Sequence, residues 1–121
     1  MFLNNLYTVL FLDGNETSVT SEIKINPEHT IYEGHFPGSP VTPGVVQLQI
    51  IKEILETYFQ SKLKMKQMRT CKFLQIINPL ETPVVQIDAR FAKSEFLEVT
   101  ASIRYKDSVY LKAQLSYLFA E

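Results

Sequence analysis

The 121-residue sequence has few of the residue types that mark several large protein classes. It contains one cysteine, and its 12 basic and 13 acidic side chains leave a net charge of −1. A lone thiol cannot form an internal disulfide, which favours a reducing compartment, and the balanced charge gives no footprint for nucleic acid. Asn4, Asn5 and Asp13 interrupt the apolar N-terminal segment, so we expect neither a signal peptide nor a membrane span. We therefore predict a cytoplasmic protein with one domain, residues 1–121.

Glycine is also scarce, and its placement is uneven. Three of the four glycines lie between Gly34 and Gly44, together with three of the six prolines. Proline fixes the backbone angle φ, and glycine permits conformations and close approaches that other residues do not. A loop of this composition is expected to hold one shape. It contains His35 and leads directly into an apolar helical pattern, so we predict the functional site here.

The remaining candidates for chemistry have simpler interpretations. Cys71 lies in an apolar, strand-like segment with no histidine nearby in sequence, which favours a small buried residue over a catalytic thiol. His29 lies in a polar turn and is interpreted as a solvated surface residue. The sequence predicts neither a metal ion nor a bound cofactor.

Alternation of apolar and polar residues predicts a sheet. Strands are expected at residues 6–12 and 18–25, joined as a hairpin by the turn signal Asp13-Gly14-Asn15. Residues 61–67 are interpreted as a polar linker. Later strands are expected at residues 68–77, 84–93, 96–105 and 108–119. The short connections between the last three predict an antiparallel meander.

One long helix separates the two groups of strands. The apolar spacing predicts it from Gly44 to about Gln60, with Thr42 as the N-cap and Pro43 at the first helical position. Its polar side is expected to include Lys52, Glu53, Glu56 and Lys62. The plan is an α+β fold in which a curved antiparallel sheet packs on one helix. The apolar arc of the helix is so wide that we expect a second subunit to cover part of it.

The loop and the start of the helix carry a family resemblance. The segment GHFPGSPVTPGV, residues 34–45, resembles the GHFPGxPxxPGV signature of the hotdog-fold 3-hydroxyacyl-[acyl carrier protein] dehydratases of bacterial fatty-acid synthesis. Phe73 followed by Pro79 is similar to a second segment of that family, although Ile76 and Leu80-Glu81 depart from it. The resemblance implies a hotdog fold, a dimer with two interfacial sites, and acyl carrier protein as the partner.

The resemblance also implies roles for individual residues. His35 would be the base that removes the C2 proton of the substrate, since histidine titrates near neutrality. The N–H of Gly44 would bind the thioester carbonyl at the positive end of the helix dipole. Substrate-binding positions implied for the loop and the acyl tunnel are Phe36, Pro37, Gly38, Val45, Leu48 and Phe73.

The sequence departs from the family at the catalytic acid. The family places a carboxylic acid on the helix fourteen residues after the histidine, and this chain has Gln49 there. A glutamine can hold a hydroxyl group or a water molecule, but it cannot donate an acidic proton. Glu53, one turn further on, is interpreted as a solvated helix residue that would reach the substrate only through a water molecule or a shifted substrate.

Several functions are consistent with this pattern. The first is a dehydratase that uses His35, the Gly44 N–H and Gln49, with His35 returning its proton to the leaving hydroxyl. The second is a hotdog protein that binds acyl chains or a carrier protein without efficient turnover. A separate alternative is that His35 only packs the loop. The third is a heteromer, because in the family the histidine and the acid of one site come from different subunits. A thioesterase is a fourth, weaker alternative.

Overall fold

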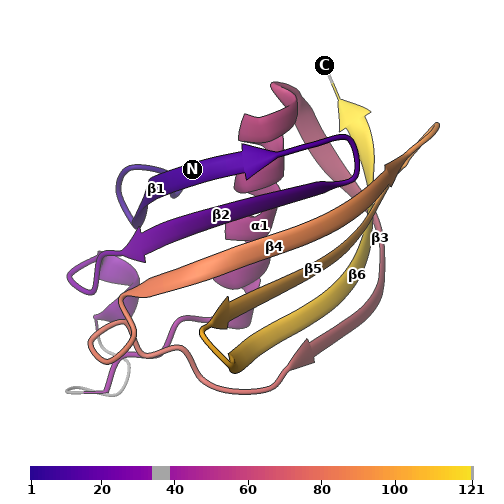
Figure 1. Cartoon of the computed structure of the whole chain (residues 1–121). Helices are drawn as coiled ribbons and strands as arrows, with labels where there is room; N and C mark the ends of the chain where they lie inside the picture. Colours follow the sequence, from indigo (N-terminus) through magenta and orange to yellow (C-terminus); the bar gives the residue numbers. More distant parts are fainter. Residues whose placement is uncertain (34–38, 121) are drawn as a thin grey trace.

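The computed structural model describes residues 1–33 and 39–120 (Figure 1). It has one long α-helix, α1 (Gly44–Phe59), and one short 3₁₀ helix, η1 (Thr30–Tyr32). The six strands are β1 (Tyr7–Gly14), β2 (Ser18–Ile25), β3 (Lys62–Phe73), β4 (Val84–Lys93), β5 (Leu97–Tyr105) and β6 (Ser108–Ala120). No helix within the described residues is long and apolar enough to cross a membrane.

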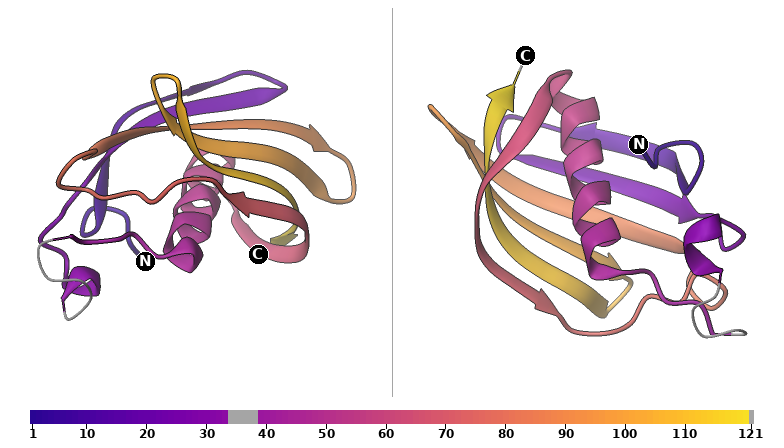
Figure 2. Two further views of the ribbon diagram at one scale, coloured as in Figure 1. Left: turned by 90° about the horizontal axis from the view of Figure 1, so that it is seen from below. Right: turned by 180° about the vertical axis from the view of Figure 1, so that it is seen from behind.

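All six strands form one antiparallel sheet in the order β1-β2-β4-β5-β6-β3. The sheet curves around α1, which lies across its concave face (Figure 2). The hairpin of β1 and β2 and the meander of β4, β5 and β6 are confirmed. So is the predicted α+β hotdog architecture, in which a curved sheet wraps a single helix.

The core lies between the helix and the concave face of the sheet. Alternate strand residues point inward because side chains in a strand alternate between the two faces. Buried side chains from the sheet include Ile23, Val85, Ile87, Ile103, Leu111 and Leu115, and those from the helix include Ile50, Ile51, Ile54 and Leu55. At the C-terminal end of α1, the Phe59 ring packs edge-on against Phe91 and Phe119, with centroids 4.9 and 5.9 Å away. These contacts fix the helix to the sheet.

The start of α1 differs from the prediction. Pro43, not Thr42, is the N-cap residue, and no side chain caps the helix there. Thr42 is buried, and its hydroxyl is paired with the hydroxyl of Tyr32 at 2.8 Å. The capping expectation was wrong because a tertiary partner engages the threonine side chain. The predicted end near Gln60 is confirmed, since Gln60 is the C-cap with a φ of 53°.

The segment after the helix also differs from the prediction, because residues 61–67 are mostly strand. β3 begins at Lys62, and the Leu63 N–H donates to Glu56 Oε2 at 2.8 Å, tying the strand to α1. The pairing of β3 with β6 shifts register between Met65 and Gln67, and again between Met68 and Thr70. The strand ends at Phe73, four residues before the predicted end at Ile77.

Candidate active site

Part of the predicted site lies outside the described residues. This applies to His35, the predicted base, and to the predicted substrate-binding residues Phe36, Pro37 and Gly38. The structure does describe both flanks of this segment, and it describes Gly44, Val45, Leu48, Gln49 and Phe73.

Buried hydrogen bonds join the two flanks of the His35 segment. The Tyr32 hydroxyl, at the end of η1, pairs with the Thr42 hydroxyl, just before α1. The Thr42 N–H donates to the Ile77 carbonyl at 3.0 Å, and the Thr42 carbonyl accepts from Gln47 Nε2 at 3.0 Å. Tyr32, Thr42 and Gln47 are all at least nine-tenths buried. Thr42 therefore fixes the start of α1 relative to η1 and to the segment that follows β3.

Gly44 is the first residue of α1, and its N–H has no acceptor among the described residues. The first amides of a helix point outward and carry partial positive charge, so this N–H suits a carbonyl oxygen that develops negative charge. The Phe73 ring lies directly on Gly44, and a Cβ atom at position 44 would be 2.5 Å from Cζ of Phe73. The glycine thus permits the aromatic ring to pack on the start of the helix.

The predicted walls of the acyl tunnel are apolar and incompletely covered. Val45 is 76% exposed and Phe73 is 51% exposed, while Leu48 is half-buried. Leu48 follows Gly44 by four residues and therefore lies on the same side of α1 as the Phe73 ring. The structure thus brings Gly44, Leu48 and Phe73 to one apolar surface.

Gln49 is half-buried on α1, and its side chain contacts Glu53, which was predicted to be solvated. The Gln49 Nε2 atom donates to Glu53 Oε2 at 2.9 Å, across one helical turn. Glu53 was expected on the solvated side, yet it is 6% exposed. The N-terminal segment covers it, and that segment is forty-six or more residues away in sequence.

The Glu53 carboxylate accepts several hydrogen bonds from this N-terminal segment. The N–H groups of Phe2 and Leu3 donate to Oε1 at 3.1 and 3.0 Å, and the Tyr7 hydroxyl donates to the same oxygen at 3.0 Å. Burial acts to raise the pKa of Glu53. The hydrogen bonds from Gln49, the Phe2 N–H and Tyr7 outweigh it, so the pKa is below its ordinary value. Glu53 is therefore ionised at neutral pH and has no proton to donate as a catalytic acid.

The contact between Gln49 and Glu53 was accessible to sequence reasoning, whereas the burial of Glu53 was not. Residues four apart on a helix are neighbours, so the spacing alone predicts the contact. Nothing in the N-terminal segment indicates that its backbone N–H groups turn onto a helix far along the chain. A charged residue on a helix was therefore assigned to the solvated side.

The other two candidates have structural explanations. His29 is half-buried: its Nδ1 accepts the Ile31 N–H at 3.0 Å at the start of η1, and its ring meets Phe2 edge-on at 6.1 Å. It is therefore less solvated than expected. Cys71 is half-buried on β3, and burial raises the pKa of its thiol, which disfavours a reactive thiolate.

One cavity, of about 370 Å³, is lined by Glu53 together with Met1, Leu3, Glu56 and Thr57, so the buried carboxylate reaches the wall of a cavity beside the end of α1. Another cavity, of about 610 Å³, lies between the start of β1, the end of β2 and residues 79–83, and none of Gly44, Gln49 or Phe73 lines it. Within residues 1–33 and 39–120, no group of three or more histidine, cysteine, aspartate or glutamate side chains is placed to hold a metal ion.

Comparison with known proteins identifies the family and supports the fold. The model of the ApeI-like family, described as ApeI dehydratase, matches residues 12–110. The chain is 26% identical to the 3-hydroxyacyl-[acyl-carrier-protein] dehydratase FabZ of Lactobacillus helveticus, over 94% of this chain and 85% of that protein. It is 25% identical to FabZ of Levilactobacillus brevis, over 96% and 86% of the two chains.

Solved structures show the same fold at lower sequence identity. A chain of the dehydratase heterocomplex ApeI:P from Xenorhabdus doucetiae has a TM-score of 0.71 at 15% identity, covering 92% of this chain and 96% of that one. A hypothetical thioesterase from Streptococcus pneumoniae, solved with coenzyme A, has a TM-score of 0.66 at 9% identity, covering 94% and 85%. These likenesses confirm the hotdog fold, and the family match over residues 12–110 shows that the chain belongs to the ApeI-like dehydratase family.

Proposed function

We propose that this protein dehydrates 3-hydroxyacyl thioesters on acyl carrier protein to trans-2-enoyl thioesters, in fatty-acid or polyketide-like biosynthesis. The family match and the two FabZ relatives support this reaction class and this carrier. The structural observation that carries the proposal is the start of α1. There the Gly44 N–H, which has no acceptor within residues 1–33 and 39–120, lies at the positive end of the helix beside an exposed apolar surface that suits an acyl chain.

In this proposal His35 acts as the base and the Gly44 N–H as the donor to the thioester oxygen. The imidazole takes the C2 proton, and the Gly44 N–H stabilises the negative charge that develops on the thioester oxygen. The bond between C3 and its hydroxyl oxygen then breaks as the C2–C3 double bond forms. The protonated imidazole returns its proton to the departing hydroxyl, which leaves as water, so no separate acid is needed.

Helix geometry supports a site built from two chains. Gly44 and Gln49 are five residues apart on α1, which places them roughly 140° apart around the helix axis. The first N–H groups of a helix point along its axis, whereas side chains project sideways, so the Gly44 N–H and the Gln49 side chain face different directions. We propose that Gln49 of one protomer holds the 3-hydroxyl group of a substrate whose thioester lies at Gly44 of its partner.

The partner protomer can be a second copy or a homologous chain. A solved structure with this fold comes from a complex described as a dehydratase heterocomplex, which motivates the second alternative. A homologue that carries a carboxylic acid in place of Gln49 would complete a site with His35 and Gly44 of this chain. In that case this chain alone would be a weakly active or inactive acyl-binding subunit. We also propose that residues 1–121 act as one domain in the cytoplasm.

The test is direct assay of the purified protein with a 3-hydroxyacyl thioester, following formation of the enoyl product. We expect turnover by the wild type and loss of turnover in His35→Ala. His29→Ala is the matched histidine control and should retain activity, because His29 caps η1 and has no part in the proposed chemistry. Turnover that appears only after a homologue is added would favour the heteromer. No enoyl product under either condition would rule out the dehydratase proposal.

A further inference from the structure

In the pair formed by Gln49 and Glu53 on α1, the charged side chain is the more deeply buried one. Gln49 is half-buried and Glu53 is 6% exposed, so the carboxylate is the inner member of the pair. The single hydrogen bond between them runs from Gln49 Nε2 to Glu53 Oε2, with a length of 2.9 Å. The proposed chemistry uses Gln49 and leaves Glu53 without a role.

Glu53 is held in place independently of Gln49. Three donors, the N–H groups of Phe2 and Leu3 and the Tyr7 hydroxyl, converge on its carboxylate from the N-terminal segment. The Met1 nitrogen also lies 3.5 Å from Oε2. A carboxylate with this many partners has little freedom to rotate, so it is a fixed reference point for the residue that contacts it.

The charge of Glu53 decides how the Gln49 amide is oriented. An ionised carboxylate can only accept hydrogen bonds, whereas the two ends of an amide differ: NH₂ donates and Oε1 accepts. The NH₂ group must therefore face Glu53, and Oε1 must point away from it. The opposite orientation would set two acceptors against each other within a partly buried pair.

We propose that Glu53 is a positioning residue that orients the Gln49 amide so that Oε1 is presented to the 3-hydroxyl group of the substrate. This inference rests on the proposed dehydration and on Gln49 facing the substrate. Glu53 itself does not touch the substrate, and it acts only through the amide that it orients.

The orientation has a consequence for substrate choice. A 3-hydroxyl group can donate a hydrogen bond to Gln49 Oε1, whereas the oxygen of a 3-oxoacyl thioester has no hydrogen to donate. A site with a fixed acceptor discriminates against a ligand that leaves that acceptor unpaired. Glu53 therefore makes the site prefer the 3-hydroxyacyl thioester to the 3-oxoacyl thioester of the same chain length.

The experiment compares the Michaelis constant for a 3-hydroxyacyl thioester with the inhibition constant of the matching 3-oxoacyl thioester. In Glu53→Gln the residue at position 53 can present either end of its amide, so Gln49 can rotate and donate to the 3-oxo oxygen. We expect the preference for the hydroxyl substrate to fall about tenfold, the equivalent of one hydrogen bond. Tyr7→Phe is the control. It removes one donor from the same carboxylate but leaves the charge that orients Gln49, so the preference should not change.

A second measurement remains available if Glu53→Gln does not fold. In the wild type, NMR should detect a scalar coupling through the hydrogen bond between the Gln49 side-chain nitrogen and the Glu53 carboxyl carbon. Absence of this coupling would overturn the orientation. An unchanged substrate preference in folded Glu53→Gln, or an equal loss of preference in Tyr7→Phe, would overturn the positioning role. A wild-type protein that shows the coupling but catalyses no dehydration would instead overturn the proposed function, and the role in substrate choice with it.

Discussion

At the scale of single residues, the most informative side chain is a carboxylate that the fold removes from water. Burial of an ionised group is unfavourable unless donors replace its hydration. Glu53 receives most of its donors from the N-terminal segment, namely the Phe2 and Leu3 N–H groups and the hydroxyl of Tyr7 at the start of β1. The cluster therefore links the N-terminal segment to the part of the helix that carries Gln49.

The lowered pKa of Glu53 predicts that this cluster stabilises the fold at neutral pH and loses its effect in acid. A carboxyl group whose pKa is lower in the folded state stabilises that state at every pH above its unfolded-state pKa, which is ordinarily 4.5. The stabilisation is lost as the pH falls through the lower, folded pKa. Glu53→Gln should therefore be less stable at neutral pH, by about 1.5–3 kcal/mol for hydrogen bonds to a charged acceptor, and should lose less stability on acidification.

The measurement is urea unfolding of both proteins at neutral pH and at a pH well below 4.5. Both proteins also contain Asp88. Burial acts to raise the pKa of Asp88, but hydrogen bonds from Gln86, Arg104 and Thr20 lower it below its ordinary value. The variant should therefore retain some sensitivity to acid. If acidification lowers the free energy of unfolding by the same amount in both proteins, Glu53 is not ionised and hydrogen-bonded in the folded state.

The sequence predicted some of the site residues and missed others for identifiable reasons. Gly44 was assigned a role because the family resemblance covers the start of the helix, and the structure places the Phe73 ring on it. Gln49 was found by its distance from His35. Glu53 was placed on the wrong side of the helix because the donors that cover it, the Phe2 and Leu3 N–H groups and the Tyr7 hydroxyl, lie forty-six or more residues away in sequence.

At the scale of elements, β3, whose first half the sequence analysis interpreted as a linker, is the strand with the least regular pairing. Five apolar residues of β3 lie opposite buried or partly buried residues of β6: Leu63, Met65, Met68, Cys71 and Phe73. Their spacing changes from two to three because Lys66 and Arg69 are extra residues at the two register shifts. This breaks the period of two on which a strand prediction depends.

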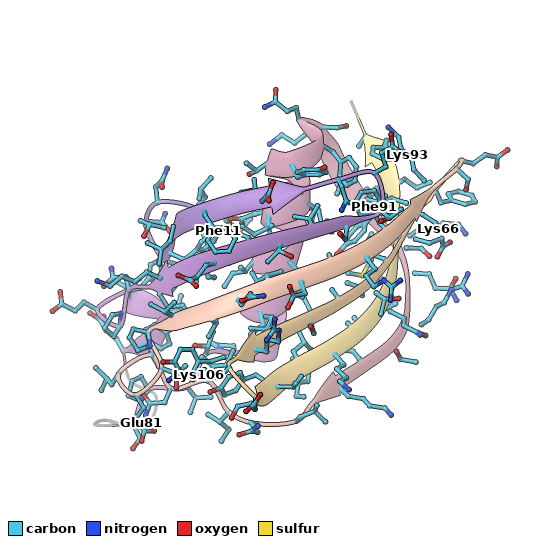
Figure 3. All side chains as sticks on the ribbon, viewed as in Figure 1. Phe11, Lys66, Glu81, Phe91, Lys93 and Lys106 are labelled. Carbon is cyan, nitrogen blue, oxygen red and sulfur yellow. The ribbon has the colours of Figure 1, made fainter. Side chains whose placement is uncertain are left out.

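The two extra residues are not loose insertions. The Lys66 ammonium lies 3.9 Å from the centre of the Phe96 ring, beside the turn between β4 and β5 (Figure 3). Arg69 lies 3.6 Å from Glu98 Oε1 on β5. Both side chains therefore reach the start of β5, and these contacts help to hold the irregular strand. They could not be anticipated from the local pattern because they come from another part of the sheet.

The pair formed by Tyr32 and Thr42 gives a prediction for the connection between η1 and α1. Thr42→Val keeps the shape of the side chain but leaves the buried Tyr32 hydroxyl without its partner. We expect a loss of about 1–3 kcal/mol in the free energy of unfolding. Adding Tyr32→Phe should recover part of that loss, because no unpaired hydroxyl then remains. A double-mutant cycle in urea checks this. Additive effects would show that the two hydroxyl groups are not coupled.

At the scale of the whole molecule, the sheet has two open edges with different surroundings. β1 forms one edge and β3 the other. Near β3, large apolar side chains remain uncovered, including Val45, Met68, Phe73, Leu74 and Ile76. Exposed apolar side chains gathered on one side of a protein often mark an interaction site. This apolar surface also adjoins Gly44, which the proposed two-chain site requires to face a partner.

We therefore predict that the protein associates with itself, or with a homologous chain, through the β3 side of the sheet. Met68→Glu places a charge at a residue that is 45% exposed in the single chain, so the fold should tolerate it. Burying that charge in an interface is unfavourable, and the dissociation constant should rise at least about tenfold. Leu10→Glu, on β1 and 50% exposed, is the matched control at the opposite edge and should not change it.

Sedimentation equilibrium over a range of protein concentrations measures this association directly, first for this chain alone and then for a mixture with a homologue. Dehydration should fall in parallel with association in Met68→Glu, because Gln49 and Gly44 of one site would then belong to separated chains. Dissociation caused by Leu10→Glu and not by Met68→Glu would assign the interface to β1. Full activity in a protein that stays monomeric at every concentration would contradict the two-chain site, since Gly44 and Gln49 of one helix face different directions.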